Sequence, residues 1–231
     1  MSTFGLVHGA WLGGWCWTHL VPYLEERGHA VVTVDLPSDL PGVGSLDYAH
    51  VVLDALSDVD DDLVLVGHSL AGLTIPVVAV HRPVRRLVYL CGVLRDPGKT
   101  LEQRNADGTD PDMTPEPLVG VEFHDDGTSE WVDPMAATRF LCEDAEPAVA
   151  TWMFRRLRRQ YSLWMERSPI DHWPKAEATY ILCTEDRLVN PVWARRAAKE
   201  KLGVEALEMP GGHSPYLSRP AELAEVLCRD L

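Results

Sequence analysis

Short apolar runs rich in β-branched residues alternate with stretches of helical periodicity along most of this chain. Such runs are typical of strands buried on both faces, and their alternation with helices predicts a mostly parallel sheet flanked by helices. The six predicted strands span residues 4–8, 30–36, 63–67, 86–93, 178–184 and 205–209. Helices are predicted at 15–27, 47–58, 70–81, 192–202 and 221–231. We therefore expect a fold of the α/β class with a six-stranded sheet.

One long segment interrupts this alternation after the fourth predicted strand. Residues 95–174 contain no pattern of a buried parallel strand; Pro, Asp and Gly are frequent at first, and helical periodicity follows from about 144 to 166. These 80 residues are too many for a connecting loop. We expect them to form an inserted, mainly helical lid on a core made of residues 1–94 and 175–231. The arginine-rich run 155–159 is expected to be a solvated helix face, with an anion or partner site as the alternative.

A serine follows the third predicted strand directly. Residues 67–72 read Gly-His-Ser-Leu-Ala-Gly, and a helical pattern begins at once. Strand, sharp turn and helix form the context that a nucleophile elbow requires, with small residues two positions before and after the serine. Gly67 meets that requirement, and Ala71 stands where the motif has a second glycine. Ser69 is therefore a candidate nucleophile; the alternative is an ordinary helix N-cap, where serine is also favoured.

A serine hydroxyl needs a neighbouring base to become a good nucleophile. After such an elbow, an acid and then a histidine are expected, each in the loop behind a later strand. The fifth predicted strand is followed by Glu185 and Asp186, either of which can supply the acid. The sixth leads into a glycine-rich turn and His213, the only one of nine histidines in a strand-to-helix loop near the end of the chain. His213 is therefore the candidate base.

The loop behind the first predicted strand is rich in glycine. Acyl transfer places negative charge on the carbonyl oxygen of the substrate, and preorganised N–H groups stabilise that charge. The amide of Leu70, directly after the serine, is one expected donor. Gly9 permits a turn that presents the amide of Ala10 as the second. The alternative is a plain glycine-rich turn; the G-x-G-x-x-G spacing of a dinucleotide-binding loop is absent.

Four motifs in this order resemble one family. They are His-Gly-Ala-Trp at 8–11, the elbow at 67–72, Cys-Thr-Glu-Asp-Arg at 183–187 and the stretch from His213 to Pro220. Together they resemble the α/β-hydrolase family of plant methyl esterases, of the salicylate-binding type, and hydroxynitrile lyases, with their bacterial esterase relatives. The resemblance covers the core and hardly extends to the lid. It implies an α/β-hydrolase fold with an apolar pocket under a helical lid and no cofactor.

The resemblance also implies roles for individual residues. The acid of the family matches Asp186, the base matches His213, and the oxyanion donors match Ala10 and Leu70. Lyases of this family carry a lysine after the catalytic histidine, whereas this chain has Ser214, so stabilisation of a cyanide leaving group is disfavoured. The residues expected to line the substrate pocket are Trp11, His68, Leu118, Trp131, Trp152, Phe154 and Trp164.

Net charge, histidine spacing and the length of apolar runs limit the kinds of partner that this chain is expected to bind. The formal net charge is −14, which argues against nucleic acid and makes a neutral small-molecule ester easier to bind than an anion. No two histidines have the spacing of metal ligands, so no metal is expected. No apolar stretch approaches the roughly 20 residues of a membrane span. A homodimer remains open, because the sequence does not determine the oligomeric state.

Five cysteines are odd in number, widely spaced and free of any C-x-x-C pair. We expect them to be buried thiols of a protein in a reducing cytoplasm rather than a disulfide framework. No secretory leader pattern is visible at the first residues.

The resulting expectation is hydrolysis of small to medium, largely apolar carboxylic esters through Ser69, His213 and Asp186 and an acyl-enzyme. Three alternatives use the same residues. The first is a cofactor-independent lyase, dehydratase or cyclase, and the second is acyl transfer to an alcohol or amine. The third is a non-catalytic receptor that binds a small molecule on the same fold.

Overall fold

The structure is a computed structural model that describes residues 1–59, 62–100, 103, 118–163 and 165–229. Its main sheet has six strands in the order β2-β1-β3-β4-β8-β9, and every neighbouring pair is parallel. The strands are β1 (Thr3–Val7), β2 (Ala30–Val34), β3 (Leu63–His68), β4 (Arg86–Leu90), β8 (Glu177–Cys183) and β9 (Leu207–Met209). The predicted parallel sheet is confirmed.

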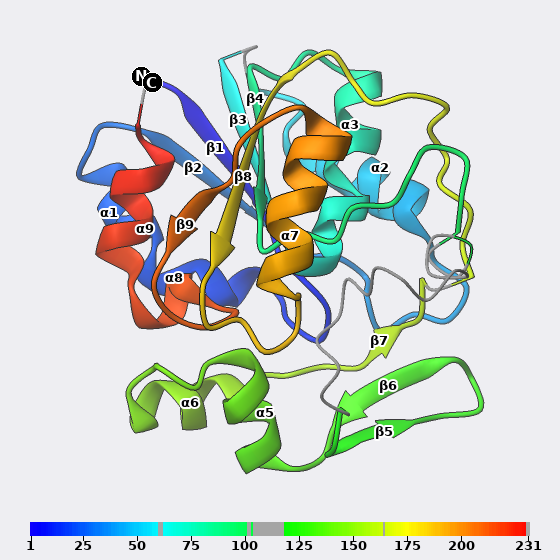
Figure 1. Ribbon diagram of the computed structural model, residues 1–231, viewed down its shortest axis with the longest axis vertical. Coiled ribbons are helices and arrows are strands. Elements are labelled where there is room, and N and C mark those ends of the chain that lie inside the picture. The colour runs from blue at the N-terminus through cyan, green and yellow to red at the C-terminus, as the bar shows by residue number, and fades with distance from the viewer. Residues whose placement is uncertain (60–61, 101–102, 104–117, 164, 230–231) are drawn as a thin grey trace.

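Helices cover both faces of this sheet (Figure 1). Along β3, Val64 and Val66 face one hydrophobic core while Leu63 and Leu65 face the other, which is why these four residues are all apolar. The first core is closed by η1 (Gly14–His19), α1 (Val21–Glu25), α8 (Pro215–Ser218) and α9 (Pro220–Leu227). The second is closed by α2 (Ser45–Ala55), α3 (Ile75–His81) and α7 (Pro191–Ala197), which continues into η3 (Ala198–Leu202).

Two predicted helices are each divided into a 3₁₀ turn and a short α-helix. The helix predicted at 15–27 is η1 followed by α1, and the one predicted at 70–81 is η2 (Ser69–Leu73) followed by α3. Pro22 and Pro76 lie in the first turns of α1 and α3. Proline lacks the N–H that a helix interior uses but fits a first turn, so each proline favours a new start.

The segment between β4 and β8 contains strands as well as helices. Its elements are β5 (Val121–Phe123), β6 (Thr128–Trp131), α5 (Pro134–Leu141), α6 (Pro147–Phe154) and β7 (Gln160–Tyr161). β6 pairs antiparallel with both β5 and β7. The helix expected from 144 to 166 is therefore wrong beyond Phe154. The pairing of β6 with β7 joins residues about 30 positions apart, and no local pattern reports it.

This inserted segment lies across the carboxyl ends of the main sheet's strands (Figure 1). Backbone hydrogen bonds join its two ends: Gly98 donates to the Ile170 carbonyl at 3.0 Å and Ser168 donates to the Lys99 carbonyl at 2.9 Å. Its side chains continue the first core, among them Trp131, Phe140 and Met153. The insertion is thus packed onto the end of the sheet where loops behind the strands converge.

Two further expectations concern the state of the cysteines and a membrane-spanning helix. All five cysteines are free, and all but Cys228 are buried. Within the described ranges, none of the helices combines the length and the apolar character needed to cross a membrane.

Candidate active site

Ser69 lies in a strained turn at the end of β3. Its φ angle is 53°, in the left-handed region that few residues other than glycine adopt. The Val93 amide donates to the Ser69 carbonyl at 2.9 Å and fixes the turn. A Cβ on Gly67 would lie 2.8 Å from Ile75 Cγ2, so the turn has no room for a larger residue there. Ala71 is buried beside it, which shows that alanine is tolerated where the motif has glycine.

His213 and Asp186 form a buried pair. Nδ1 of His213 lies 2.8 Å from Oδ2 of Asp186, and the two residues are only 2% and 6% exposed. The other carboxylate oxygen accepts from the amides of Leu188 at 2.8 Å and Val189 at 3.0 Å. An ionised carboxylate only accepts hydrogen bonds, so it favours a proton on Nδ1 and leaves Nε2 free to take one. Glu185 is exposed, so of the two acid candidates the structure brings Asp186 to the histidine.

His68 holds the loop of His213 next to the serine. Its Nε2–H donates to the His213 carbonyl at 2.9 Å, its Nδ1 lies 3.3 Å from the Tyr216 hydroxyl, and the two imidazole centroids are 4.6 Å apart. Burial, and then the charge of His213, keep the pKa of His68 well below its usual value. Because Ser69 follows His68 in the chain, His213 is placed beside the serine turn. His68 was expected in the pocket wall; in the structure its ring is fully buried and supports this loop.

The loop behind β1 approaches the serine closely. A Cβ on Gly9 would lie 2.8 Å from Ser69 Cβ, so only glycine fits at this position. The next amide, of Ala10, has no acceptor in the part of the chain that the structure describes. Leu70 is the second residue of η2, where an amide has no partner within the helix. Both expected oxyanion donors thus lie beside the serine and are available.

His8 fixes the direction of the Ala10 amide, a role that the sequence did not reveal. Its Nδ1–H donates to the Gly9 carbonyl at 2.9 Å, and its Nε2 accepts from the Leu36 amide at 2.9 Å. Burial lowers the pKa of His8 from 6.5 to about 4, so the ring is neutral as these two bonds require. The Gly9 carbonyl and the Ala10 N–H belong to one trans peptide and point in opposite directions. Holding the carbonyl therefore aims the N–H.

Arg158 ties the inserted segment to the same loop. Its amide donates to the Trp11 carbonyl at 2.9 Å and its Nε to the Leu12 carbonyl at 3.1 Å. Its two Nη atoms reach the Leu36 carbonyl at 2.9 Å and Asp35 Oδ2 at 3.3 Å. The expectation of a helix face is wrong for the whole run 155–159, because α6 ends at Phe154, and the expectation of a solvated position is wrong for this arginine. It lies beyond the end of α6 and joins the insertion to the loop that carries Ala10.

Replacing Arg158 by alanine should impair turnover as well as folding. Three backbone carbonyl and carboxylate acceptors lose their donor, and we expect the free energy of unfolding to fall by about 1–3 kcal/mol. The loop that aims the Ala10 amide loses an anchor, and we expect kcat for an ester substrate to fall about 10- to 100-fold. Urea unfolding and steady-state kinetics measure the two effects.

Arg159→Ala is the matched control. Arg159 is more exposed and pairs with Glu130 at 3.0 Å, within the insertion, so its loss should change kcat less than about twofold. Equal losses of kcat in the two variants would show that the contacts of Arg158 with the loop do not matter for turnover.

The other residues expected in the pocket lie in two places, one around Trp11 and one against η1. Trp11 and Trp131 meet edge to face with centroids 5.6 Å apart, and the Trp11 Nε1–H donates to the Ser129 hydroxyl at 3.0 Å. Leu118 and Phe154 are partly buried against the same core. Trp152 lies instead against Trp15 and His19 of η1, with centroids 5.2 and 5.3 Å away. Trp164 lies outside the described residues.

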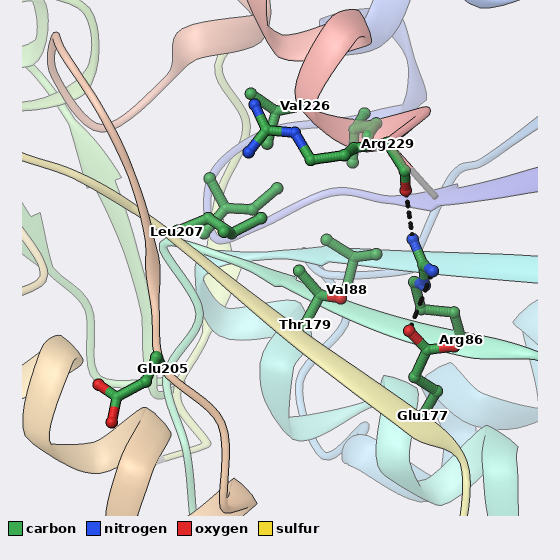
Figure 2. A pocket seen from close by; sticks show the side chains of 10 residues that line it. Arg86, Val88, Glu177, Thr179, Glu205, Leu207, Val226 and Arg229 are labelled. Atoms are coloured by element: carbon green, nitrogen blue, oxygen red, sulfur yellow. Dashed lines mark hydrogen bonds and ion pairs between the residues drawn. The ribbon is translucent and has the colours of Figure 1, made fainter. Parts of the chain in front are cut away.

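A separate cavity of about 190 Å³ opens at the other end of the sheet (Figure 2). Its wall includes Val88, Thr179, Leu207 and Val226, and Arg86 at its rim bonds to Glu177 and to the Arg229 carbonyl. Arg86 and Glu177 are the first residues of β4 and β8, whereas His213 and Asp186 follow the last residues of their strands. This cavity therefore contributes nothing to the serine site.

Comparison with known proteins agrees with this geometry. The model of the alpha/beta hydrolase family matches residues 6–226. A pyrethroid hydrolase of Sphingobium wenxiniae is 30% identical over 96% of this chain and 85% of its own length. Salicylic acid-binding protein 2 of Nicotiana tabacum is 30% identical over 97% of this chain and 95% of its own. The crystal structure of polyneuridine aldehyde esterase superposes with a TM-score of 0.82 at 20% identity, covering 98% of both chains.

A parallel sheet, a strained serine turn and a buried acid–histidine pair behind later strands define the class of α/β hydrolases. With the family match over nearly its whole length, this chain belongs to the alpha/beta hydrolase family.

Proposed function

We propose that this protein is a carboxylic ester hydrolase that acts through Ser69, His213 and Asp186. The observation that carries the proposal is the buried hydrogen bond of 2.8 Å between His213 and Asp186, in a loop that His68 joins to the serine turn. The positive φ of Ser69 adds independent support, because strain of this kind is characteristic of a nucleophile elbow. A relative from Nocardioides named carbendazim hydrolyzing esterase and the pyrethroid hydrolase are consistent with ester chemistry.

The proposed reaction has two steps. Ser69 Oγ attacks the ester carbonyl while His213 Nε2 takes its proton, and the amides of Ala10 and Leu70 stabilise the oxyanion. The protonated imidazole is stabilised by Asp186 and returns the proton to the leaving alcohol. Water then attacks the acyl-enzyme by the same route and releases the acid. The histidine thus serves as base and as acid in each half of the cycle.

The proposed substrates are small to medium, largely apolar esters. We take residues 95–174 as the lid, since its described part lies across the carboxyl ends of the strands and contributes Trp131 beside Trp11. Aromatic side chains such as these suit a ligand that is mainly hydrocarbon. The net charge of −14 favours a neutral substrate over an anionic one.

Labelling with a fluorophosphonate, together with turnover of p-nitrophenyl butyrate, tests the proposal. We expect one label per chain on Ser69, and release of equal amounts of p-nitrophenol and butyrate. A binding pocket without an activated serine would not react with the probe, which separates a receptor from an enzyme. Absence of both labelling and hydrolysis over a panel of apolar esters would contradict the proposal. Label without hydrolysis, with an ester of an added alcohol as product, would indicate acyl transfer.

A further inference from the structure

Cys91 lies beside the acid–histidine pair and has no part in the proposed ester cleavage. It is the first residue after β4, while Asp186 and His213 follow β8 and β9. These three strands are neighbours in the sheet, so their carboxyl ends deliver a thiol, a carboxylate and an imidazole to one place. The donor atoms of the three side chains all lie within 4.8 Å of one another, and all three residues are buried.

We propose that Cys91, Asp186 and His213 form a binding site for a thiophilic divalent cation such as Zn²⁺ or Cd²⁺, and that occupation of this site switches the hydrolase off. Zinc sites combine thiolate, imidazole and carboxylate ligands in this way, and three protein ligands leave a fourth position for water. Mg²⁺ and Ca²⁺ prefer oxygen ligands, so a thiol and an imidazole select against them. Among the described residues, this is the one group of three such ligands at this spacing.

The donor atoms lie within 4.8 Å of one another, so binding one cation requires movements of up to about 1 Å. Metal–ligand bonds of about 2.0–2.3 Å place tetrahedral ligand atoms about 3.3–3.7 Å apart. Nδ1 of His213 and Oδ2 of Asp186 are now 2.8 Å apart and must separate by about half an ångström. Asp186 is already held in place, because its other oxygen accepts from two backbone amides. Hydrogen bonds to a ligand's other polar atom orient that ligand toward the metal.

The exchange of protons explains the expected inhibition. Three bonds form, from the cation to sulfur, to Nδ1 and to the carboxylate oxygen. The Cys91 S–H bond breaks and its proton passes to solvent, so one proton is released for each cation bound. The Nδ1–H bond of His213 also breaks, and the neutral ring carries its proton on Nε2 instead. An imidazole with a proton on Nε2 cannot take one from Ser69, so the base of the proposed reaction is lost.

The thiolate is the form of cysteine that binds a metal, so cation binding must displace the proton of the Cys91 thiol. Access to three buried groups is also restricted, so we expect inhibition to develop during preincubation rather than at mixing.

The direct test is titration of the whole protein with Cd²⁺, followed by the ultraviolet charge-transfer absorption of cadmium thiolates. We expect one equivalent per chain to produce the band in the wild type. Cys91→Ala should lose the band and Cys228→Ala, which removes the most exposed thiol, should keep it. The φ angle of Cys91 is 47°, where glycine is unstrained, so Cys91→Gly is the second variant if the alanine variant does not fold. A band that survives in the Cys91 variant, or that fails to form in the wild type, overturns the site.

Inhibition is tested separately, because it rests on the proposed function whereas cation binding does not. Preincubation with Zn²⁺ should lower p-nitrophenyl butyrate turnover of the wild type at least tenfold, and EDTA should restore it. Each variant is compared with its own metal-free rate. Zn²⁺ should lower the turnover of the Cys91 variant less than twofold. Mg²⁺ and Ca²⁺ should have no effect on either protein. Absence of turnover without metal argues against the proposed function alone, and equal inhibition of both proteins by Zn²⁺ argues against the site alone.

Discussion

Replacing Ser69 by alanine is expected to lower kcat for p-nitrophenyl butyrate by about four to six orders of magnitude. The methyl group of alanine cannot attack the ester carbonyl, so only the oxyanion donors and the binding of substrate remain. These contribute a residual rate of about 10³–10⁴ over the uncatalysed reaction in enzymes with this arrangement. The measurement is steady-state kinetics with an active-site count, so that traces of wild-type protein are recognised.

The fold should survive this change. Alanine has the same Cβ as serine, so the strain at a φ of 53° stays the same and no buried hydrogen bond of the serine side chain is removed among the described residues. We expect the free energy of unfolding to change by less than about 1 kcal/mol. A folded Ser69→Ala protein that retains more than a hundredth of the wild-type kcat would place the nucleophile elsewhere.

Replacing Asp186 by asparagine is the second large effect, an expected loss of about four orders of magnitude in kcat. The amides of Leu188 and Val189 need an acceptor, so the oxygen of the asparagine side chain stays with them. The amino group of asparagine then faces His213 Nδ1, where it donates. Nδ1 must accept, the proton moves to Nε2, and the ring can no longer act as a base.

Glu185→Gln is the control for this experiment, because Glu185 is the adjacent acid in the same loop. Its side chain is exposed, so neutralising it should change kcat less than about twofold. A rate profile between pH 5 and 9 accompanies both variants, since a wrong tautomer is not corrected by raising the pH. If Glu185→Gln proved the more damaging substitution, the acid would have been misassigned.

We expect the contacts of Arg158 to connect the inserted segment to the proposed oxyanion site. The same side chain bonds to the loop behind β1 and belongs to the inserted segment, so the position of the Ala10 amide depends on how that segment is seated. His8 holds the neighbouring peptide from the core side. The proposed oxyanion donor is therefore held from two directions, and changes in the insertion should reach kcat as well as KM.

The sequence by itself determined the elements that depend on short stretches of chain. The six strands were found within a few residues of their ends, because the central ones are buried on both faces and are therefore mostly apolar. The serine turn was visible for a similar reason: its small flanking residue, its strand and its helix are consecutive. The division of two helices near Pro22 and Pro76 was not predicted, although proline, which favours a first turn, was a local signal for it.

Only the tertiary structure decided what depends on residues far apart in the chain. Asp186 was already preferred over Glu185 by the family resemblance, whereas the strand order and the pairing of β6 with β7 follow from long-range pairing, which leaves no local pattern. The same holds for His8 aiming an amide, for Arg158 joining the insertion to a loop, and for Cys91 meeting His213. Chain periodicity encodes which face of an element is buried; which partner meets it is decided by the packing of the whole domain.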